Sequence, residues 1–191
     1  MVLNGIDRIH NFDFLFKGKK LGVITSLSGL SKDFTPSWKI LAERYTVRAL
    51  FAPEHGLYGC ENAGTVWDSE NKSIAGMPLY SLYRQDGQDF KPDTLTDIDT
   101  LVYDIQDVGA RFYTYISTLI LAMRAASMHG KAVIVLDRPN PLGGVKVEGN
   151  IVKKSFESFI GMYPLCIRYG LTAAELARMV HTEEQLCCPL H

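Results

Sequence analysis

Short apolar runs alternate along this chain with stretches of helical periodicity, and this alternation constrains the fold more than any other feature. The apolar runs have the length and composition of buried strands, and they span residues 21–25, 46–52, 77–83, 100–105 and 131–137. Helical patterns span residues 36–45, 112–130 and 171–180. Strands that alternate with helices predict an α/β fold, in which a mostly parallel sheet is covered by helices on both faces.

The clearest helical pattern covers residues 112–130. Its apolar residues form one stripe, made of Phe112, Tyr115, Ile116, Leu119, Met123 and Ala126. Gly130 stands where helices commonly end in a left-handed residue. Thr172 and Glu175 have the spacing of a capping box and mark the start of a later helix. Both helices therefore have one end defined by local signals.

The composition is that of an ordinary soluble globular domain. The chain has 191 residues, of which 47% are apolar and 21% are charged, with a formal net charge of −1. This length suits one sizeable core, so we predict a single domain over residues 1–191. The net charge creates no global field that would favour nucleic acid or an anionic membrane, and neither partner is expected.

The sequence contains no segment that predicts insertion into a membrane. No apolar run approaches the ~20 residues of a spanning helix. The first residues, MVLNGIDRIHNFDF, carry charges where a signal peptide has its apolar segment. The sequence as it stands therefore predicts a cytoplasmic protein, or one whose export signal has been removed. Its cysteines form no C-x-x-C pair, and we expect reduced thiols at Cys60, Cys166, Cys187 and Cys188.

Polar side chains follow the predicted strands at the point where each strand ends. In chain order they are Thr25, Ser26, Glu54, His55, Asp104, Gln106, Asp107, Arg111, Asp137, Arg138 and Asn140. Ligands of open parallel sheets bind outside the carboxyl ends of the strands. We therefore expect these side chains to converge on one rim of the sheet and to form the functional site.

Two kinds of site that are common in this fold class have little support in the sequence. The segment LGVITSLSGL has only Gly22 and Gly29 and lacks G-x-G-x-x-G, and no Walker A sequence is present, so no nucleotide cofactor is expected. The residues that could build an oxygen-rich metal site are His55, Asp104, Asp107 and Asp137. No paired-histidine spacing supports that site, so no metal is expected.

A carboxylate acid/base site fits the rim best. Glycoside hydrolysis needs one carboxylic acid to protonate the leaving oxygen and usually a second carboxylate as base or nucleophile. Glu54 follows an apolar strand, where partial burial favours the protonated form that a general acid needs. Glu148, in the turn-rich sequence VEGN, could fold over the same rim, and His55 could orient Glu54 or bond a sugar hydroxyl. The alternatives are a helix cap for Glu54, a solvated turn for Glu148 and a structural histidine.

The segment DIQDVGARFYTY carries further candidates for substrate binding. Asp104 and Asp107 precede a helix, where carboxylates complement the positive end of the dipole. Arg111 falls in the first predicted turn of that helix, where its charge is unfavourable. We therefore expect Arg111 to pair with Asp107 or Asp104, or to bind an anionic ligand.

Two loops complete the predicted rim. In DRPNPLGG, two prolines stiffen the loop that carries Asp137, Arg138 and Asn140. The alternative for this loop is a rigid, salt-bridged turn without a role in binding. Residues 59–76 are polar and irregular, and long loops beside a site often cover the substrate.

Several long motifs occur in order along nearly the whole chain. They are FAPEHGLYG, AGTVWDS, MPLYSLY, DIQDVGARFYTYISTL, LDRPNPLGG, VEGN and SFIGMYPLCIRYGLTAAELA. Together they resemble the bacterial exo-β-N-acetylmuramidase family. The resemblance implies a Rossmann-like three-layer sandwich, which would be the N-terminal catalytic domain of a longer protein whose smaller C-terminal domain is absent. It also implies that Glu54, in the P-E-H-G motif, is the catalytic glutamate.

The activity implied by this resemblance is removal of terminal β-1,4-linked N-acetylmuramic acid from the non-reducing ends of peptidoglycan fragments. The lactyl carboxylate of that sugar needs a cation, for which Arg111 and Arg138 are candidates and Arg111 is preferred. Family members are longer than this chain and include exported proteins, so we expect exposed apolar surface where the missing domain packs. Two other functions stay open, a module that binds a muropeptide sugar without cleaving it and a metal-dependent hydrolase.

Overall fold

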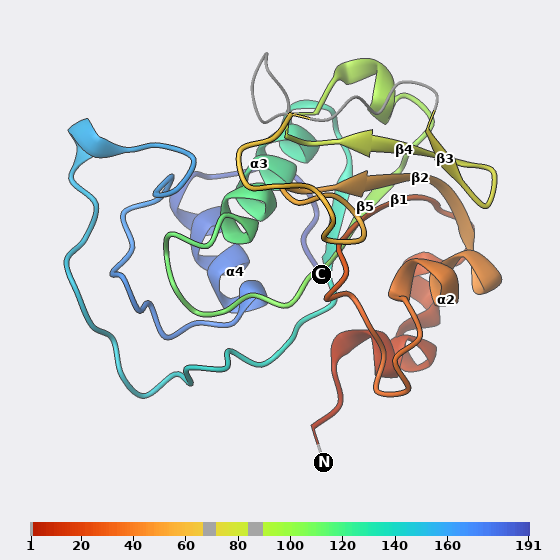
Figure 1. Ribbon diagram of the computed structural model, residues 1–191. Coiled ribbons are helices and arrows are strands. Elements are labelled where there is room, and N and C mark those ends of the chain that lie inside the picture. Colours follow the sequence, from red (N-terminus) through yellow and green to blue (C-terminus); the bar gives the residue numbers. More distant parts are fainter. Residues whose placement is uncertain (1, 67–71, 84–89) are drawn as a thin grey trace.

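The computed structural model describes residues 2–66, 72–83 and 90–191, and within them six strands form one sheet (Figure 1). The strands are β1 (Lys20–Thr25), β2 (Thr46–Ala52), β3 (Ser73–Ile74), β4 (Met77–Ser81), β5 (Thr100–Asp104) and β6 (Ala132–Val135). The α-helices are α1 (Asp13–Phe16), α2 (Ser37–Arg44), α3 (Tyr115–Met128) and α4 (Ala173–Glu183), and the 3-10 helices are η1 (Gly5–Phe12), η2 (Pro92–Leu95) and η3 (Lys154–Phe156).

The strand order in the sheet is β3-β4-β2-β1-β5-β6. β1 pairs in parallel with both β2 and β5, and the β2–β4 and β5–β6 pairs are also parallel, whereas β3 runs antiparallel to β4 at one edge. The predicted α/β fold with a mostly parallel sheet is confirmed. The chain order of the strands reverses at β1, so the carboxyl ends of β1, β2 and β5 border the crevice where doubly wound sheets bind ligands.

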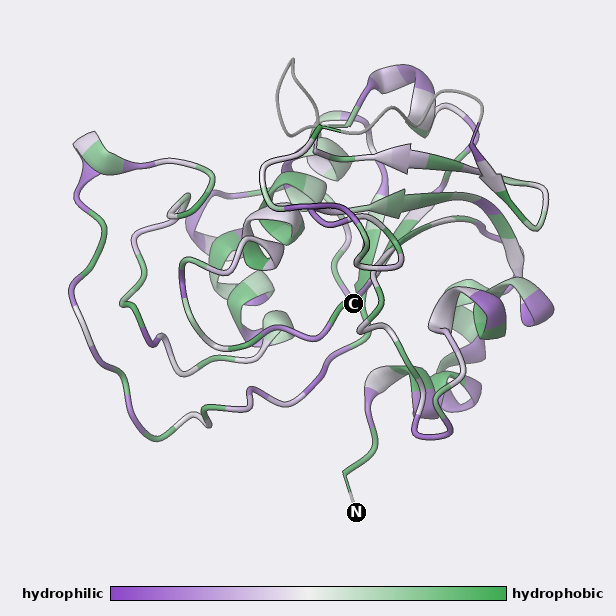
Figure 2. Cartoon of the chain, viewed as in Figure 1, coloured by the Kyte–Doolittle hydropathy of each residue, from purple (hydrophilic) through white to green (hydrophobic). Residues whose placement is uncertain are grey.

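Helices cover both faces of the sheet and produce the three layers (Figure 1). On one face, α3 and α4 pack over a core that includes Phe51, Leu119 and Leu176. On the other face, η1, α1 and α2 pack over a second core that includes Phe16 and Leu41. Successive strand residues point to opposite faces, so one strand contributes side chains to both cores. Figure 2 shows the apolar residues gathered in the central strands and in α3.

The helix predicted over residues 112–130 begins later than expected, at Tyr115. The backbone before it is engaged elsewhere, because the Arg111 amide donates to the Ile167 carbonyl at 2.9 Å and Ala110 forms an isolated bridge with Arg168. Phe112 consequently lies outside the buried stripe and is 57% exposed. Arg111 is therefore not in the first turn of α3, and that part of the prediction is wrong.

Both ends of the chain pack against the sheet in ways that the sequence analysis did not predict. Residues 5–16 form η1 and α1, and they bury Ile6 and Ile9. Near the other end, the amides of Val133 and Val135 donate to the carbonyls of Pro189 and His191 at 2.8 and 2.9 Å, which extends the sheet beyond β6.

The remaining predictions concern a loop and a strand near the β3 edge. Part of the irregular loop predicted over residues 59–76 lies outside the described residues, and its last part forms β3. The strand predicted over 77–83 ends at Ser81, whose hydroxyl accepts a hydrogen bond from the Tyr83 amide at 3.2 Å. None of the described helices has both the length and the hydrophobicity that crossing a membrane requires.

Candidate active site

The carboxyl ends of the parallel strands deliver polar residues to one edge of the sheet, as predicted. Ser26 follows β1, Glu54 follows β2, and Asp107 follows β5. At this edge the ends of β1 and β5 are joined, since the Thr25 hydroxyl donates to the Asp104 carbonyl at 2.9 Å. A Cβ added at Gly29 would lie 2.1 Å from the Thr25 hydroxyl oxygen, so only glycine fits at that position.

Glu54 is half-buried, and protein donors contact both oxygens of its carboxylate. The Gly64 amide donates to Oε1 at 3.0 Å, and the Thr114 hydroxyl donates to Oε2 at 2.8 Å. The Tyr115 hydroxyl makes a longer bond of 3.4 Å to the main-chain carbonyl of Glu54. The carboxylate is thus held between a loop and the start of α3, and among the described residues no cation forms an ion pair with it.

Tyr115, which contacts Glu54, packs against two other tyrosines. The Tyr103 hydroxyl donates to the Tyr115 carbonyl at 3.1 Å, and the rings of Tyr113 and Tyr115 meet edge to face with centroids 4.6 Å apart. Burial raises the pKa of the Tyr115 hydroxyl, and the neighbouring Tyr113 and the Glu54 charge raise it further. Tyr115 therefore stays a neutral phenol, able to donate a hydrogen bond near Glu54 but unsuited to act as a base.

His55 contacts the loop that also supplies the Gly64 amide to Glu54. Its φ of 71° lies in the left-handed region, and its Nδ1 lies 3.0 Å from the Glu61 carbonyl oxygen. It lines a hollow of about 490 Å³ together with Leu79, whose side chain belongs to the core beneath α2. No hydrogen bond joins His55 to the Glu54 carboxylate within the described residues, so the orienting role of His55 stays a prediction.

Glu148 lies on an exposed loop. Its side chain is 61% exposed, and its carboxylate accepts from Arg168 Nη1 at 2.8 Å. Two backbone hydrogen bonds of 3.0 and 2.9 Å join the same pair of residues. In this arrangement Glu148 contacts Arg168 and makes no hydrogen bond with Glu54, and its role as the second catalytic carboxylate stays a prediction.

Asp104 and Arg138 form a buried ion pair. Arg138 donates through Nε and Nη2 to the two carboxylate oxygens at 2.7 and 3.0 Å, and Nη2 also donates to the Leu30 carbonyl at 2.8 Å. The two side chains are only 0% and 5% exposed. Burial raises the pKa of Asp104, and the guanidinium of Arg138 opposes that shift. This geometry matches the alternative of a rigid, salt-bridged turn.

Asp107 and Arg111 do not form the predicted ion pair. Asp107 Oδ2 accepts from the Gly109 amide at 2.7 Å and from the Tyr169 hydroxyl, while its buried Oδ1 has no partner among the described residues. Burial raises the pKa of Asp107, and these two hydrogen bonds oppose the shift. Arg111 Nη1 donates instead to the carbonyls of Asn150 and Leu165, at 2.6 and 2.7 Å.

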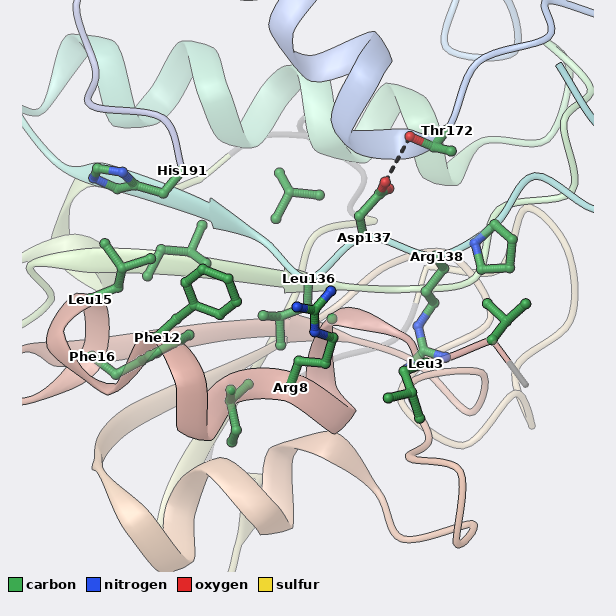
Figure 3. A pocket seen from close by; sticks show the side chains of 16 residues that line it. Leu3, Arg8, Phe12, Leu15, Phe16, Leu136, Asp137, Arg138, Thr172 and His191 are labelled. Carbon is green, nitrogen blue, oxygen red and sulfur yellow. Dashed lines mark hydrogen bonds between the residues drawn. The ribbon is translucent and has the colours of Figure 1, made fainter.

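Asp137 and Asn140 hold loops and a helix end in place. Asp137 accepts from the Thr172 hydroxyl at 2.8 Å and from the Ala174 amide at 3.0 Å, at the start of α4 (Figure 3). Asn140 donates to the Leu171 carbonyl at 2.9 Å. The hollow in Figure 3, of about 380 Å³, lies next to Asp137 and is lined largely by apolar residues, and Glu54 does not line it.

The sequence analysis missed the donors that bind Glu54. Thr114 was interpreted only as part of the helix predicted over residues 112–130, Tyr115 only as part of its apolar stripe, and Gly64 only as part of an irregular loop. The one local signal was the pair of hydroxyl-bearing residues at the start of the helix, directly after a rim segment. Within the described residues, no three His, Cys, Asp or Glu side chains are grouped so that they could hold a metal ion.

Comparisons with known proteins identify a family and several relatives. Residues 21–191 match the family described as exo-β-N-acetylmuramidase NamZ, N-terminal. The peptidoglycan β-N-acetylmuramidase NamZ of Bacillus subtilis (strain 168) is 42% identical over 185 residues, which are 95% of this chain and 44% of that protein.

Two solved structures of DUF1343 family proteins from Bacteroides fragilis NCTC 9343 are also similar. One has a TM-score of 0.88 at 42% identity and the other 0.82 at 30% identity; each is matched over 99% of this chain, and over 48% and 50% of its own. The chain thus spans about half the length of these relatives. It belongs to the family of the N-terminal part of the exo-β-N-acetylmuramidase NamZ.

Proposed function

We propose that this chain is the catalytic half of an exo-acting glycoside hydrolase, which releases terminal β-1,4-linked N-acetylmuramic acid from the non-reducing ends of peptidoglycan fragments. The observation that carries the proposal is the Glu54 carboxylate, half-buried at the end of β2 and bonded by the Gly64 amide and the Thr114 hydroxyl. The other rim carboxylates that follow the strands, Asp104, Asp107 and Asp137, each hold protein groups together. The B. subtilis relative is a peptidoglycan β-N-acetylmuramidase, which supports the substrate class.

Glu54 suits proton transfer to a glycosidic oxygen. Hydrolysis of a glycoside requires a carboxylic acid that protonates the leaving oxygen. The Gly64 amide can only donate, so Oε1 must accept, and a transferable proton on Glu54 would sit on Oε2. Glu148 remains our candidate for the second carboxylate, and it would have to exchange its bond with Arg168 for the substrate side of the rim.

The test is hydrolysis of a chromogenic β-glycoside of N-acetylmuramic acid. We would assay the chain itself and a chimera in which residues 1–191 replace the matching segment of the B. subtilis relative. We expect release of the sugar, and we expect Glu54→Gln to lower the rate at least ~10²-fold while the fold remains intact, because the change keeps the shape and removes the titrating proton. Near-normal turnover by Glu54→Gln would remove Glu54 from the mechanism.

The two other functions give different outcomes in the same assay. A module that only binds a muropeptide sugar would bind N-acetylmuramic acid without turnover in either protein. A metal-dependent hydrolase would lose its activity in the presence of a chelator such as EDTA. Turnover that is insensitive to EDTA and lost in Glu54→Gln separates the proposed glycosidase from both.

We also propose that the loop between β6 and α4 contacts the part of the relatives that this chain does not span. This loop extends away from the sheet in Figure 1, and its large apolar side chains are exposed: Val145 is 99% exposed, Phe156 75% and Ile160 58%. Exposed apolar surface of this kind marks interaction sites. Phe156→Ser and Ile160→Ser should weaken binding of the chain to the separately produced remainder of the B. subtilis relative. Unchanged binding would exclude this surface.

A further inference from the structure

Thr114 stands at the N-cap of α3 but does not cap it. A threonine at this position usually accepts a hydrogen bond from an amide in the first turn, which is worth ~1 kcal/mol. Thr114 makes no such bond, and its backbone has already turned into the right-handed helical region, with φ −70° and ψ −9°. Its hydroxyl donates instead to Glu54 Oε2 at 2.8 Å. The helix therefore gives up a local stabilising contact in favour of one with a residue that is 60 positions away in the sequence.

The opposite side of the carboxylate is held by a group of a different kind. The Gly64 amide donates to Oε1 at 3.0 Å, from a backbone with φ of 72° that glycine adopts readily. An amide cannot accept a hydrogen bond, so Oε1 is an acceptor whenever this contact is present. A hydroxyl can both donate and accept. The Gly64 contact persists when Oε2 gains a proton, because it involves the other oxygen. The Thr114 hydroxyl can still donate to the remaining lone pair of the protonated Oε2, so its contact serves both states of the carboxyl.

We infer that Thr114 is a positioning residue for Glu54, whose hydroxyl holds Oε2 in place both when Glu54 is protonated and when it is ionised. This inference rests on the proposed function, because it assigns Oε2 as the oxygen that exchanges the proton with substrate. Thr114 is 9% exposed, so water has little access to replace its hydroxyl. Without it, Oε2 would rotate among orientations of which few face the leaving oxygen, and turnover would fall while substrate affinity stayed the same.

The experiment compares three variants in whichever of the two assayed proteins hydrolyses the glycoside. Thr114→Val keeps the branched shape and removes the hydroxyl, and Thr114→Ser keeps the hydroxyl and removes the methyl group. Thr118→Val is the matched control, since Thr118 lies one turn later in α3, is 3% exposed and bonds the Thr114 carbonyl at 3.4 Å. Thermal unfolding of each variant shows whether the fold is intact.

We expect Thr114→Val to lower kcat roughly 10- to 100-fold, with KM changed less than about twofold. Thr114→Ser should keep kcat within about threefold of the parent, and Thr118→Val should change neither constant. Normal turnover by Thr114→Val would overturn the inference and leave the proposed function standing. A roughly 10- to 100-fold loss of kcat in Thr114→Ser would also overturn the inference, because this variant keeps the hydroxyl. The result for Thr114→Ser decides the question even if Thr114→Val does not fold. No hydrolysis by either parent protein overturns both proposals.

Discussion

The starts of α3 and α4 both pair a threonine with a carboxylate, but the two pairs have different surroundings. At each start, the hydroxyl of an N-cap threonine donates to a carboxylate at the end of a strand, over 2.8 Å in both cases. Thr172 also accepts from the Glu175 amide in a capping box, and its partner Asp137 accepts from the Ala174 amide, so every group serves the helix end. Thr114 caps nothing, and its partner Glu54 bonds no amide of α3 in the described structure.

This difference gives a physical criterion for telling a structural carboxylate from a functional one. A carboxylate whose partners all belong to one helix end lowers the free energy of the fold through those partners. A carboxylate that is held by an isolated hydroxyl and a loop amide adds less to the stability of the fold. Its contacts mainly fix the orientation of the carboxylate itself. By this criterion Asp137 is structural and Glu54 is the candidate for chemistry.

The largest effect is expected at the buried ion pair of Asp104 and Arg138. Arg138→Met would leave Asp104 buried without its ion-pair partner, and we expect a loss of ~3–5 kcal/mol in the free energy of unfolding, measured by chemical denaturation. Lys20→Met is the control, because Lys20 and its partner Asp97 are 45% and 57% exposed, and its effect should be much smaller. Similar losses in both variants would contradict the structural role of the buried pair.

Glu54 and Asp137 should respond in opposite ways to removal of the charge. Glu54→Gln should lower the rate at least ~10²-fold and leave the melting temperature nearly unchanged. Asp137→Asn should lower the free energy of unfolding by ~1 kcal/mol, through the weakened helix start, and leave the rate per folded molecule unchanged. Rates from active-site titration and melting curves measure both. The comparison fails if Asp137→Asn reduces the rate of a fully folded protein as strongly as Glu54→Gln does.

Arg111 lies just before α3, and only part of its guanidinium is bonded to the protein. It therefore tests whether the start of α3 also contributes to substrate binding. Nη1 is occupied by two carbonyls, whereas Nε and Nη2 have no protein partner in the described structure. We expect Arg111→Met to weaken binding of N-acetylmuramic substrates by ~1.5–3 kcal/mol and to leave binding of N-acetylglucosaminides unchanged. Inhibition constants for both sugars check this. Equal losses on the two sugars would mean that Arg111 acts only by holding Asn150 and Leu165.

The two threonines should differ in their effect on stability. Thr172→Val removes a cap and a contact with Asp137, and it should cost ~1–2 kcal/mol in the free energy of unfolding. Thr114→Val should cost less, because no cap is lost and the Glu54 carboxylate keeps its contact with the Gly64 amide. Urea unfolding of the two variants measures the difference. A larger loss in Thr114→Val would show that its contact with Glu54 mainly stabilises the fold.

The smallest effect concerns the pH dependence of stability at Asp107. Burial raises the pKa of Asp107 above its ordinary value of 3.8, so the folded state binds this proton more tightly than the unfolded state. The contribution of Asp107 is therefore fully present below pH 3.8 and is lost as the pH rises through the folded-state pKa. Relative to Asp107→Asn, the parent protein should lose stability over that interval. Parallel stability curves for the two proteins would contradict this sign.

Much of the fold could be predicted from the sequence because the signals for it are local. Apolar runs between turns marked the parallel strands, and the capping box at Thr172 marked the start of α4. The start of α3 could not be found in this way, because the amide of Arg111 bonds the carbonyl of Ile167 and the helix can begin only after that contact. Its displacement changed the surroundings of Arg111 and of Thr114.

The sequence by itself determined that carboxylates would meet at one rim, since parallel strands end at the same edge of a sheet. Only the tertiary structure decided which of these carboxylates are bonded within the fold and which one could act on a substrate. Asp104 is neutralised by a residue 34 positions later and Asp137 bonds one 35 positions later, while the partner of Glu54 is 60 positions away. Pairings over such distances depend on how the layers pack, and no local pattern encodes them. Packing therefore left Glu54 half-exposed and, among the residues that the structure describes, without an ion-pair partner.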